Sequence, residues 1–342
     1  MQFFRRSFSI FLFLSSIYAH SSEYKWQSSE FVWNYGIAQI ADIGLPRNPK
    51  LCFIRDEMFR NSNYSKIKKG DVVWMKPNDL SSFCSFAKIK KIEPVILIIS
   101  GMDYSFPYEC NLSEEDIHFL LNNPSISHIF AQNSTISNDK ITQIPIGVDY
   151  HTNAYKDKKT RISNKEIRNQ ELIFQEIIKK SHTNKNKKIK LFVDFHLSDT
   201  IQNGPQKRYK ELGENRGDIF EKLKETQLVD YISYKIPREE LWKIKSKYLF
   251  SVSPHGNGLD CHRTWEDLLL GCIVIVKKSS LDDLYKDLPV VIVDSWDEIT
   301  EQNLFLWKKK FEQLLENKTY KKKLYNSYWI QKIFQKKKEI YE

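Results

Sequence analysis

Short apolar runs alternate with amphipathic stretches along most of the chain. In the first half, residues 94–100 form a continuous apolar run, as strands buried on both faces of a parallel sheet do. Further strands are predicted at residues 71–75, 127–132 and 141–145. Ser113, with Asp116 three residues later, predicts a capped helix start. This alternation is typical of a layered α/β domain.

The second half repeats the alternation more regularly. Pro237 suits the first turn of a helix, and Gly271 suits the end of another. We therefore expect a second doubly wound α/β unit. Its strands are predicted at residues 189–195, 228–234, 248–253, 273–276 and 290–294, and its helices at 218–226, 237–245 and 261–270.

A polar segment rich in Lys and Asn separates the two halves. Its middle, residues 164–180, has apolar side chains at helical spacing and predicts one helix. We place the domain boundary in this segment. The predicted division is an N-terminal α/β domain (20–155), a polar linker (156–187), a C-terminal α/β domain (188–299) and Lys-rich helices (300–342).

Residues 1–19 are typical of a targeting segment. Arg5 and Arg6 precede a short apolar stretch, and Ala19 suits a cleavage site. The stretch is too short to cross a bilayer, which takes about 20 apolar residues. We expect a signal peptide or short anchor, which would place the protein in the secretory pathway or cell envelope. The alternative is a buried amphipathic helix, and the protein would then be cytoplasmic.

Composition narrows the classes of protein. The 342 residues suffice for two domains, because one core rarely grows past roughly 250–300 residues. The low content of Gly and Pro, 11 residues of each, excludes a collagenous or Pro-rich disordered chain. The net charge of +10 suits an anionic partner. Since the excess is scattered Lys and no nucleic-acid recognition motif is present, we do not expect nucleic-acid binding.

The five cysteines form no CxxC pair and have no zinc spacing. Neither a zinc site nor a disulfide scaffold is therefore predicted. Cys261 and Cys272 flank one predicted helix. A helix of about ten residues separates their Cα atoms by roughly 16 Å at 1.5 Å per residue, and a disulfide requires less than about 7 Å. We therefore expect these two thiols to be unbridged.

Residues 253–271 carry the densest candidate chemistry, predicted as strand, loop and helix. Gly256 and Gly258 let a ligand approach the loop backbone, and Asp260 is a good N-cap for the helix. The free N–H groups of the helix start form a ready anion site. The alternative is that the two glycines only form a tight turn.

Charged and polar side chains follow at helical spacing. His255 and His262 add hydrogen-bond donors, and Arg263 adds a fixed positive charge. Arg263 and Glu266 are three residues apart, so they share one helical face. The cation can meet a diphosphate, and the carboxylate can accept from two ribose hydroxyls. The alternative is an ordinary intrahelical ion pair worth roughly a few tenths of a kcal/mol.

Residues 253–296 resemble the C-terminal half of exostosin-like glycosyltransferases of the GT-B type. Their sequence is SPHGNGLDCHRTWEDLLLGCIVIVKKSSLDDLYKDLPVVIVDSW. The similarity is close over residues 248–296. It is thinner upstream, where SGMDY at 100–104 and IPIGVDYH at 144–151 are similar to strand ends of that family. His255 stands where the family usually has Arg, and Val274 where it usually has Pro.

The resemblance implies a GT-B-like fold, in which two doubly wound Rossmann-like domains face a cleft and C-terminal helices follow. The N-terminal domain would be the acceptor side, and the C-terminal domain would bind the nucleotide sugar. Glu266 would hold the ribose. Arg216, or Arg208 as the alternative, would support the leaving diphosphate. The other donor-binding residues implied are His255, Gly256, Asn257, Gly258, His262 and Arg263.

Glycosyl transfer requires the charge that develops on the diphosphate to be neutralised. No Asp-x-Asp metal motif occurs in the chain, so we expect neither a metal nor another cofactor, and we assign the charge to the helix that carries Arg263. A base for the acceptor hydroxyl is expected from the N-terminal side. Asp103, Asp149 and His151 follow predicted strand ends there. Asp103 is the candidate, with a turn cap as its alternative role.

We therefore expect a metal-independent glycosyltransferase that moves a sugar from a nucleotide-sugar donor to a glycan or glycolipid hydroxyl. One alternative is a non-catalytic sugar- or nucleotide-binding relative, which His255 keeps open. The other is a basic surface interaction protein. In either case the Lys-rich tail suits a peripheral contact with anionic lipid.

Overall fold

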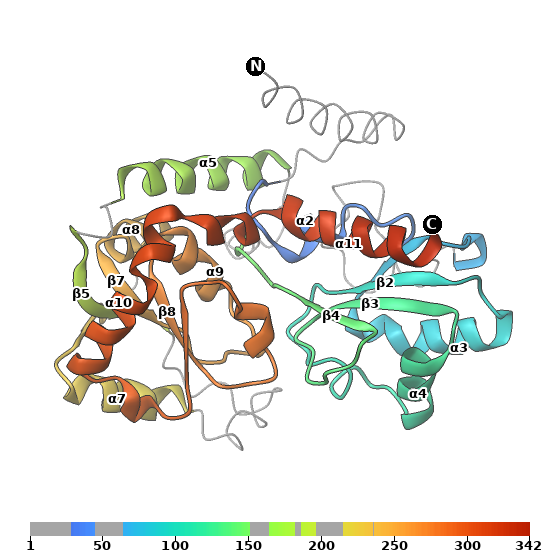
Figure 1. The fold of residues 1–342 in the computed structure, drawn as a ribbon, viewed down its shortest axis with the longest axis horizontal. Helices are drawn as coiled ribbons and strands as arrows, with labels where there is room; N and C mark the ends of the chain where they lie inside the picture. Colours follow the sequence, from blue (N-terminus) through green and yellow to red (C-terminus); the bar gives the residue numbers. More distant parts are fainter. Residues whose placement is uncertain (1–28, 45–63, 151–163, 182–185, 196–214, 235) are drawn as a thin grey trace.

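The computed structural model describes residues 29–44, 64–150, 164–181, 186–195, 215–234 and 236–342. The described strands form two parallel sheets, in the orders β1-β2-β3-β4 and β6-β5-β7-β8-β9. Figure 1 shows them as two units side by side, with helices around each. The predicted segment 1–19 and the candidates His151 and Arg208 lie outside the described residues.

The first sheet is covered on both faces. Its central strand β2 is buried at every position because β1 and β3 flank it. Helices α3 and α4 cover one face, and α2 and α11 cover the other. The elements are α2 (Asn34–Ala38), η3 (Tyr64–Lys66), β1 (Val72–Met75), η4 (Pro77–Asp79), α3 (Leu80–Lys90), β2 (Val95–Ile99), α4 (Glu114–Asn122), β3 (Ile126–Gln132) and β4 (Ile141–Ile144).

The second sheet reverses its strand order. The chain runs from β5 outward to β6 and then returns past β5 to form β7, β8 and β9. Ligands of doubly wound sheets bind at the carboxyl ends of the strands where such a reversal occurs. The elements are β5 (Lys188–Val193), α7 (Arg216–Glu225), β6 (Val229–Tyr231), α8 (Arg238–Lys245), β7 (Tyr248–Val252), α9 (His262–Leu269), β8 (Ile273–Lys277), η7 (Asp282–Tyr285), β9 (Val290–Val293) and η8 (Trp296–Glu298).

The C-terminal helices connect the two units. Helix α10 (Glu301–Asn317) packs against β5, and η9 (Thr319–Leu324) leads into α11 (Asn326–Tyr341), which returns to the first sheet. At its end, the Tyr341 hydroxyl lies 2.8 Å from the hydroxyl of Ser127 in β3. In Figure 1 α10 runs along the side of the second unit, and α11 lies above the first sheet. Helix α5 (Asn164–Lys180) lies on the outside of the second unit, against α8.

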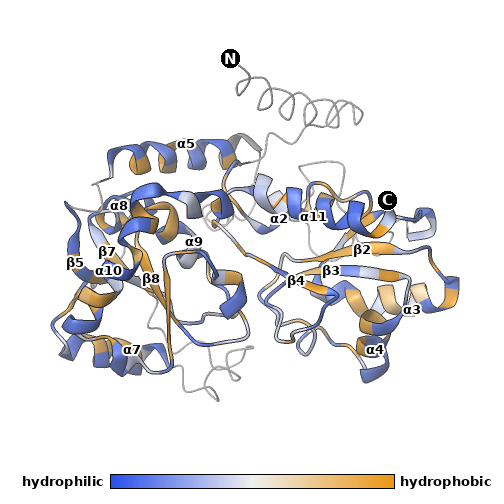
Figure 2. Ribbon diagram, viewed as in Figure 1, coloured by the Kyte–Doolittle hydropathy of each residue, from blue (hydrophilic) through white to orange (hydrophobic). Residues whose placement is uncertain are grey.

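The predicted fold class is confirmed: the chain is α/β, with two Rossmann-like parallel sheets and C-terminal helices. Most strand positions are apolar and the outer sides of the helices are polar (Figure 2), as the sequence pattern indicated. Ser113 caps α4, and Asp116 completes the capping box, as predicted. Among the strands that the structure describes, the strand order reverses only in the second sheet.

The packing of residues 31–38 was not predicted from the sequence. Residues 31–38 lie in the core against the first sheet, although their sequence lacks a clear period. Asn326 at the start of α11 holds this segment, since its amide donates to the Phe31 carbonyl and accepts from the Trp33 N–H.

None of the described helices is long and apolar enough to cross a membrane.

Candidate active site

The candidate residues gather at the strand reversal of the second sheet. β5 ends at Val193 and β7 ends at Val252, and these strands are neighbours with parallel direction. Asp194 and Phe195 follow β5 directly, while the loop 253–261 follows β7 and leads into α9. The motif found in the sequence therefore lies at the sheet edge where ligands of this fold bind.

The glycine loop is closed by its own hydrogen bonds and by Arg216. The Gly256 N–H donates to the Gly258 carbonyl at 3.0 Å, and His255 donates through Nδ1 to the Leu259 carbonyl at 2.9 Å. Arg216, in the first turn of α7, donates through Nε to the His255 carbonyl at 2.9 Å. A Cβ at Gly256 would lie 2.9 Å from Arg216 Nη2, so the glycine makes room for this guanidinium.

Gly258 brings the loop against the first unit. A Cβ at this position would lie 2.7 Å from the Asp103 carbonyl oxygen and 2.7 Å from the Asn133 amide nitrogen. The same Asn133 amide donates to the Asp103 carbonyl at 3.1 Å and accepts from the Asp260 N–H at 2.9 Å. The structure thus places Asp103, which follows β2, beside the loop. Asn257, between the two glycines, is exposed.

Arg263 is held on one side only. Its Nε donates to Asp194 at 2.6 Å, whereas its Nη1 is buried and has no hydrogen-bond partner among the described residues. The guanidinium lies 5.8 Å from the centre of the Phe195 ring, and that of Arg216 lies 5.9 Å from the same ring. Two fixed positive charges therefore flank one aromatic side chain at the reversal point.

A buried network of charged side chains, formed by Asp194, Lys245 and Asp267, holds Arg263 in place. The Lys245 ammonium, almost fully buried, contacts Asp194 at 2.8 Å and Asp267 at 2.5 Å. Burial acts to raise the pKa of Asp194, but Lys245 and Arg263 outweigh it and hold that pKa well below its usual value. Burial raises the pKa of Asp267, and the negative charge of Asp194 raises it further, whereas the positive charge of Lys245 acts to lower it. Because each charge has an opposite neighbour, the network fixes the side of Arg263 that faces Asp194.

Glu266 has partners that the sequence pattern did not predict. Its carboxylate pairs with Arg238 and accepts from the Trp242 indole N–H at 2.9 Å and from the Asp149 N–H at 3.2 Å. The Arg238 guanidinium stacks 4.6 Å from the Trp242 ring. The alternative, an intrahelical ion pair between Arg263 and Glu266, is wrong, since each side chain pairs with a residue of another element.

These contacts leave Glu266 one free lone pair. A carboxylate offers about four hydrogen-bond acceptor positions, and three are filled: two on Oε1 and one on Oε2. Recognition of two ribose hydroxyls would require one of the present partners to withdraw. A single hydroxyl can bind Oε2 without any such change.

Asp260 and His262 join the two units. Asp260 does not cap α9 as predicted, because Cys261 is the N-cap residue. The Asp260 carboxylate instead accepts from the Ile146 N–H at 2.8 Å, and His262 donates through Nδ1 to the Gly147 carbonyl at 2.6 Å. Residues 146–147 follow β4 of the first unit, so both side chains serve the contact between the units. Cys261 and Cys272, at the two ends of α9, are free thiols as expected.

The structure thus brings Asp103, Arg216, His255, Gly256, Gly258 and Arg263 to one place. Sequence reasoning missed Asp194, Arg238, Trp242 and Lys245. A signal existed for Asp194, because it follows a predicted strand of the same sheet. Arg238 and Trp242 lie four residues apart on a predicted helix and hence on one face, but nothing in their spacing pointed to Glu266.

No family model matches the sequence, and no curated protein matches it. The chain is similar in structure to the N-terminal domain of Candida albicans trehalose-6-phosphate phosphatase, with 13% identity, coverage of 81% of this chain and 72% of that one, and a TM-score of 0.44. A similar structure is that of a UDP-forming trehalose-phosphate synthase of Burkholderia xenovorans. It has 11% identity, coverage of 83% of this chain and 77% of that one, and a TM-score of 0.41.

A third similar structure is the pneumococcal O-GlcNAc transferase GtfA in complex with UDP and GlcNAc. It has 12% identity, coverage of 81% of this chain and 58% of that one, and a TM-score of 0.34. Identities and scores this low assign no activity to the chain. The exostosin-like resemblance of residues 248–296 therefore stays a prediction.

Proposed function

We propose that the protein is a metal-independent glycosyltransferase that moves a sugar from a nucleotide-sugar donor to a hydroxyl of a glycan or glycolipid. The observation that carries the proposal is the meeting of Arg263 and Arg216 over Phe195 at the carboxyl ends of β5 and β7. Doubly wound sheets bind their ligands at this point, and two guanidinium groups suit a diphosphate.

Arg263 is the proposed ligand of the leaving diphosphate. Its Nη1 is buried and lacks a partner within the described part of the chain, so a phosphate oxygen would satisfy a donor that is otherwise costly to bury. As the glycosidic bond breaks, negative charge grows on the diphosphate oxygen. The contact with Arg263 therefore strengthens in the transition state, which is the condition for catalysis. Asp194 and Lys245 position the guanidinium before the donor arrives.

Glu266 is the proposed ribose ligand, through the free lone pair on Oε2. Arg238 and Trp242 are its positioning residues, because they hold the carboxylate from two sides. His255, Gly256, Asn257, Gly258 and His262 would complete the donor site, as the exostosin-like motif implies. Since the Nδ1 atoms of both histidines already donate to carbonyls, these two side chains contribute mainly by holding the loop and the contact between the units.

Asp103 is the proposed base for the acceptor hydroxyl. It lies beside Gly258, and its charge contributes to the raised pKa of Cys261, for which burial is the largest cause. Asp103 is partly exposed, as a group that must meet an incoming hydroxyl has to be. It would take the acceptor proton while the acceptor oxygen bonds to the anomeric carbon and the diphosphate leaves with the electrons of the broken bond.

Two wider parts of the proposal rest on the sequence. The exostosin-like subtype depends on residues 248–296, and residence in the secretory pathway or cell envelope depends on residues 1–19. The Lys-rich tail is the proposed membrane contact. We propose no role in nucleic-acid binding.

The test is an incubation of the protein with UDP-, GDP- and ADP-sugars, with and without glycan acceptors and with and without EDTA. Release of nucleoside diphosphate that persists in EDTA is the expected result. Binding without turnover would make the protein a non-catalytic relative, and loss of turnover in EDTA would contradict the metal-independent mechanism. Absence of nucleotide binding would remove the proposed function altogether.

A further inference from the structure

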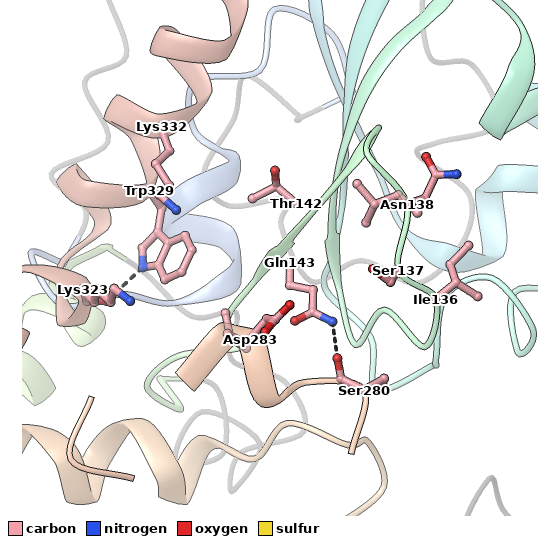
Figure 3. A pocket seen from close by; sticks show the side chains of 12 residues that line it. Ile136, Ser137, Asn138, Thr142, Gln143, Ser280, Asp283, Lys323, Trp329 and Lys332 are labelled. Atoms are coloured by element: carbon pink, nitrogen blue, oxygen red, sulfur yellow. Dashed lines mark hydrogen bonds between the residues drawn. The ribbon is translucent and has the colours of Figure 1, made fainter. Parts of the chain in front are cut away.

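A polar pocket lies at the junction of the two units and the C-terminal helices, outside the candidate donor site. Its volume is about 240 Å³. It is lined by the segment 136–143 of the first unit, by η7 of the second and by Trp329 and Lys332 of α11. Figure 3 shows side chains from all three parts facing one space. None of the residues assigned to the donor lines this pocket.

Gln143 presents an unsatisfied acceptor at this pocket. Its amide nitrogen donates to the Ser280 carbonyl at 2.6 Å and to the Ser134 carbonyl at 3.3 Å, which fixes the orientation of the amide. The amide oxygen is buried and has no partner among the described residues. In Figure 3 this oxygen points away from Ser280, towards Asp283. Because buried acceptors in folded proteins are almost always paired, the position favours a ligand with a hydrogen-bond donor.

The rest of the lining offers a second acceptor, a donor and an aromatic wall. One oxygen of Asp283 contacts Lys286 at 2.8 Å, and the other is unused by any described residue. Lys332 lies 5.6 Å from the centre of the Trp329 ring and pairs with no carboxylate of the described chain. Trp329 itself is fixed, since its indole N–H donates to the Lys323 carbonyl at 2.9 Å.

This chemistry selects among ligand classes. A phosphate would face the Asp283 carboxylate, and an apolar ligand would leave the Gln143 oxygen unpaired. A divalent cation would find one carboxylate, whereas hard cations take six or more oxygen ligands. A sugar ring meets all the requirements, because its hydroxyls both donate and accept and its C–H face packs on an aromatic ring. The pocket is smaller than the roughly 300–1,000 Å³ of sites for larger ligands, so one ring fits.

We infer that this pocket is a subsite for one sugar ring of the acceptor, bound by Gln143, Asp283 and Lys332 against Trp329. The inference rests on the proposed glycosyl transfer. The two sites share a wall: the Ser280 hydroxyl donates to the Ser134 carbonyl at 2.9 Å, and the adjacent Asn133 holds Asp103 and Asp260. A ring in the pocket would hold a glycan whose next part extends towards Asp103.

The test uses calorimetric titration of the full chain with methyl glycosides of glucose, galactose, mannose, xylose and N-acetylglucosamine. At least one glycoside should bind. Lys332→Ala and Asp283→Ala should each weaken it about tenfold, the loss expected for one hydrogen bond to a charged group. Lys336→Ala is the matched control, because Lys336 lies on the same helix and pairs with Glu339 at 2.9 Å outside the pocket.

Each outcome separates the subsite from the donor site. Binding of UDP, GDP or ADP should be equal in wild type, Lys332→Ala and Asp283→Ala. If no glycoside binds, or if these variants bind it as wild type does, the subsite is overturned, whatever the nucleotides do. If a glycoside binds and is weakened as expected while no nucleotide binds, the subsite stands as a sugar site and the proposed transferase function fails.

Discussion

Arg263, in the first turn of α9, donates to Asp194, which directly follows β5, at 2.6 Å. The bond uses the Nε edge of the guanidinium and leaves Nη1 buried without a partner among the described residues. Asp194 keeps its charge because Lys245 and Arg263 lower its pKa against the effect of burial. The pair therefore holds a cationic donor ready at the point where the strand order reverses.

Glu266→Gln should separate ribose recognition from diphosphate recognition. The substitution removes the charge that Oε2 offers to a ribose hydroxyl, so affinity for a nucleoside diphosphate should fall by about tenfold. Affinity for inorganic pyrophosphate should not change, because Arg263 and Arg216 remain. Calorimetric titrations with both ligands check this. Equal losses for both would place Glu266 outside ribose binding.

Glu266→Gln should also lower the free energy of unfolding, because Arg238 loses its charged partner. Its side chain is 14% exposed, and Asp149 lies 4.0 Å away as a weaker replacement. Breaking a buried pair costs about 3 kcal/mol. Urea unfolding of wild type and Glu266→Gln measures this loss, and equal stability of the two would contradict it.

Gly258→Ala should loosen the contact between the units. The new methyl group would lie 2.7 Å from the Asp103 carbonyl, a backbone atom that cannot rotate away. Overpacking of this kind costs about 1–3 kcal/mol. Gly217→Ala is the control, because its Cβ would meet only the Asn215 side chain at 3.2 Å. Equal melting temperatures for the two variants would show that the loop does not press on the first unit.

Asp103→Asn should affect turnover and leave donor binding unchanged. A general base contributes about 10²–10⁴-fold to rate, whereas Asp103 is not among the residues proposed to hold the donor. Measured kcat should therefore fall by about 10²-fold or more at constant Kd for nucleoside diphosphate. Asp139→Asn, on an exposed loop, is the control. A turn-capping role alone would leave kcat near the wild-type value.

Glu171 should make stability depend on pH. Burial raises its pKa from 4.5 to about 7, although the N–H groups of Glu30 and Phe31 donate to it and act to lower the pKa. The folded state thus binds this proton more tightly than the unfolded state, so stability is lost as the pH rises from about 4.5 through 7.

The size of the effect follows from the shift. About 2.5 pKa units at 1.36 kcal/mol each correspond to roughly 3 kcal/mol. The stability of Glu171→Gln relative to wild type should therefore rise by roughly 2–3 kcal/mol between pH 5 and pH 8 in urea unfolding. Glu176→Gln, exposed on the same helix, should show no such change. A parallel pH dependence for wild type and Glu171→Gln would contradict the raised pKa.

The sequence predicted the strands well because their signal is local. Residues 95–99 are all apolar, and the strand found there is buried at every position. The glycine loop and α9 were also predicted, since glycines and helical spacing are local features. The returning helix α11 was predicted only as a helix, because its contact with the first sheet involves residues such as Ser127, more than two hundred positions away.

Pairings within the site depended on tertiary structure. The spacing of three residues left an ion pair between Arg263 and Glu266 open as an alternative, but each pairs with a residue of another element: Asp194 after β5 and Arg238 on α8. Sequence spacing cannot rank such partners, because it contains no information on which distant charge lies nearest. Asp260 was misassigned for the same reason: its carboxylate binds the Ile146 N–H of the first unit instead of capping α9.

The most direct test of the central claim is titration of UDP, GDP, ADP and CDP against wild type and Arg263→Ala, with melting curves for both and Lys222→Ala as a charge control. One nucleoside diphosphate should bind wild type and, at 100 times its Kd, add about 2.7 kcal/mol to its stability. Arg263→Ala should bind it at least about tenfold more weakly, and Lys222→Ala should match wild type. Binding of none of the four, or equal binding by Arg263→Ala and wild type, would contradict a diphosphate site at the reversal of the second sheet.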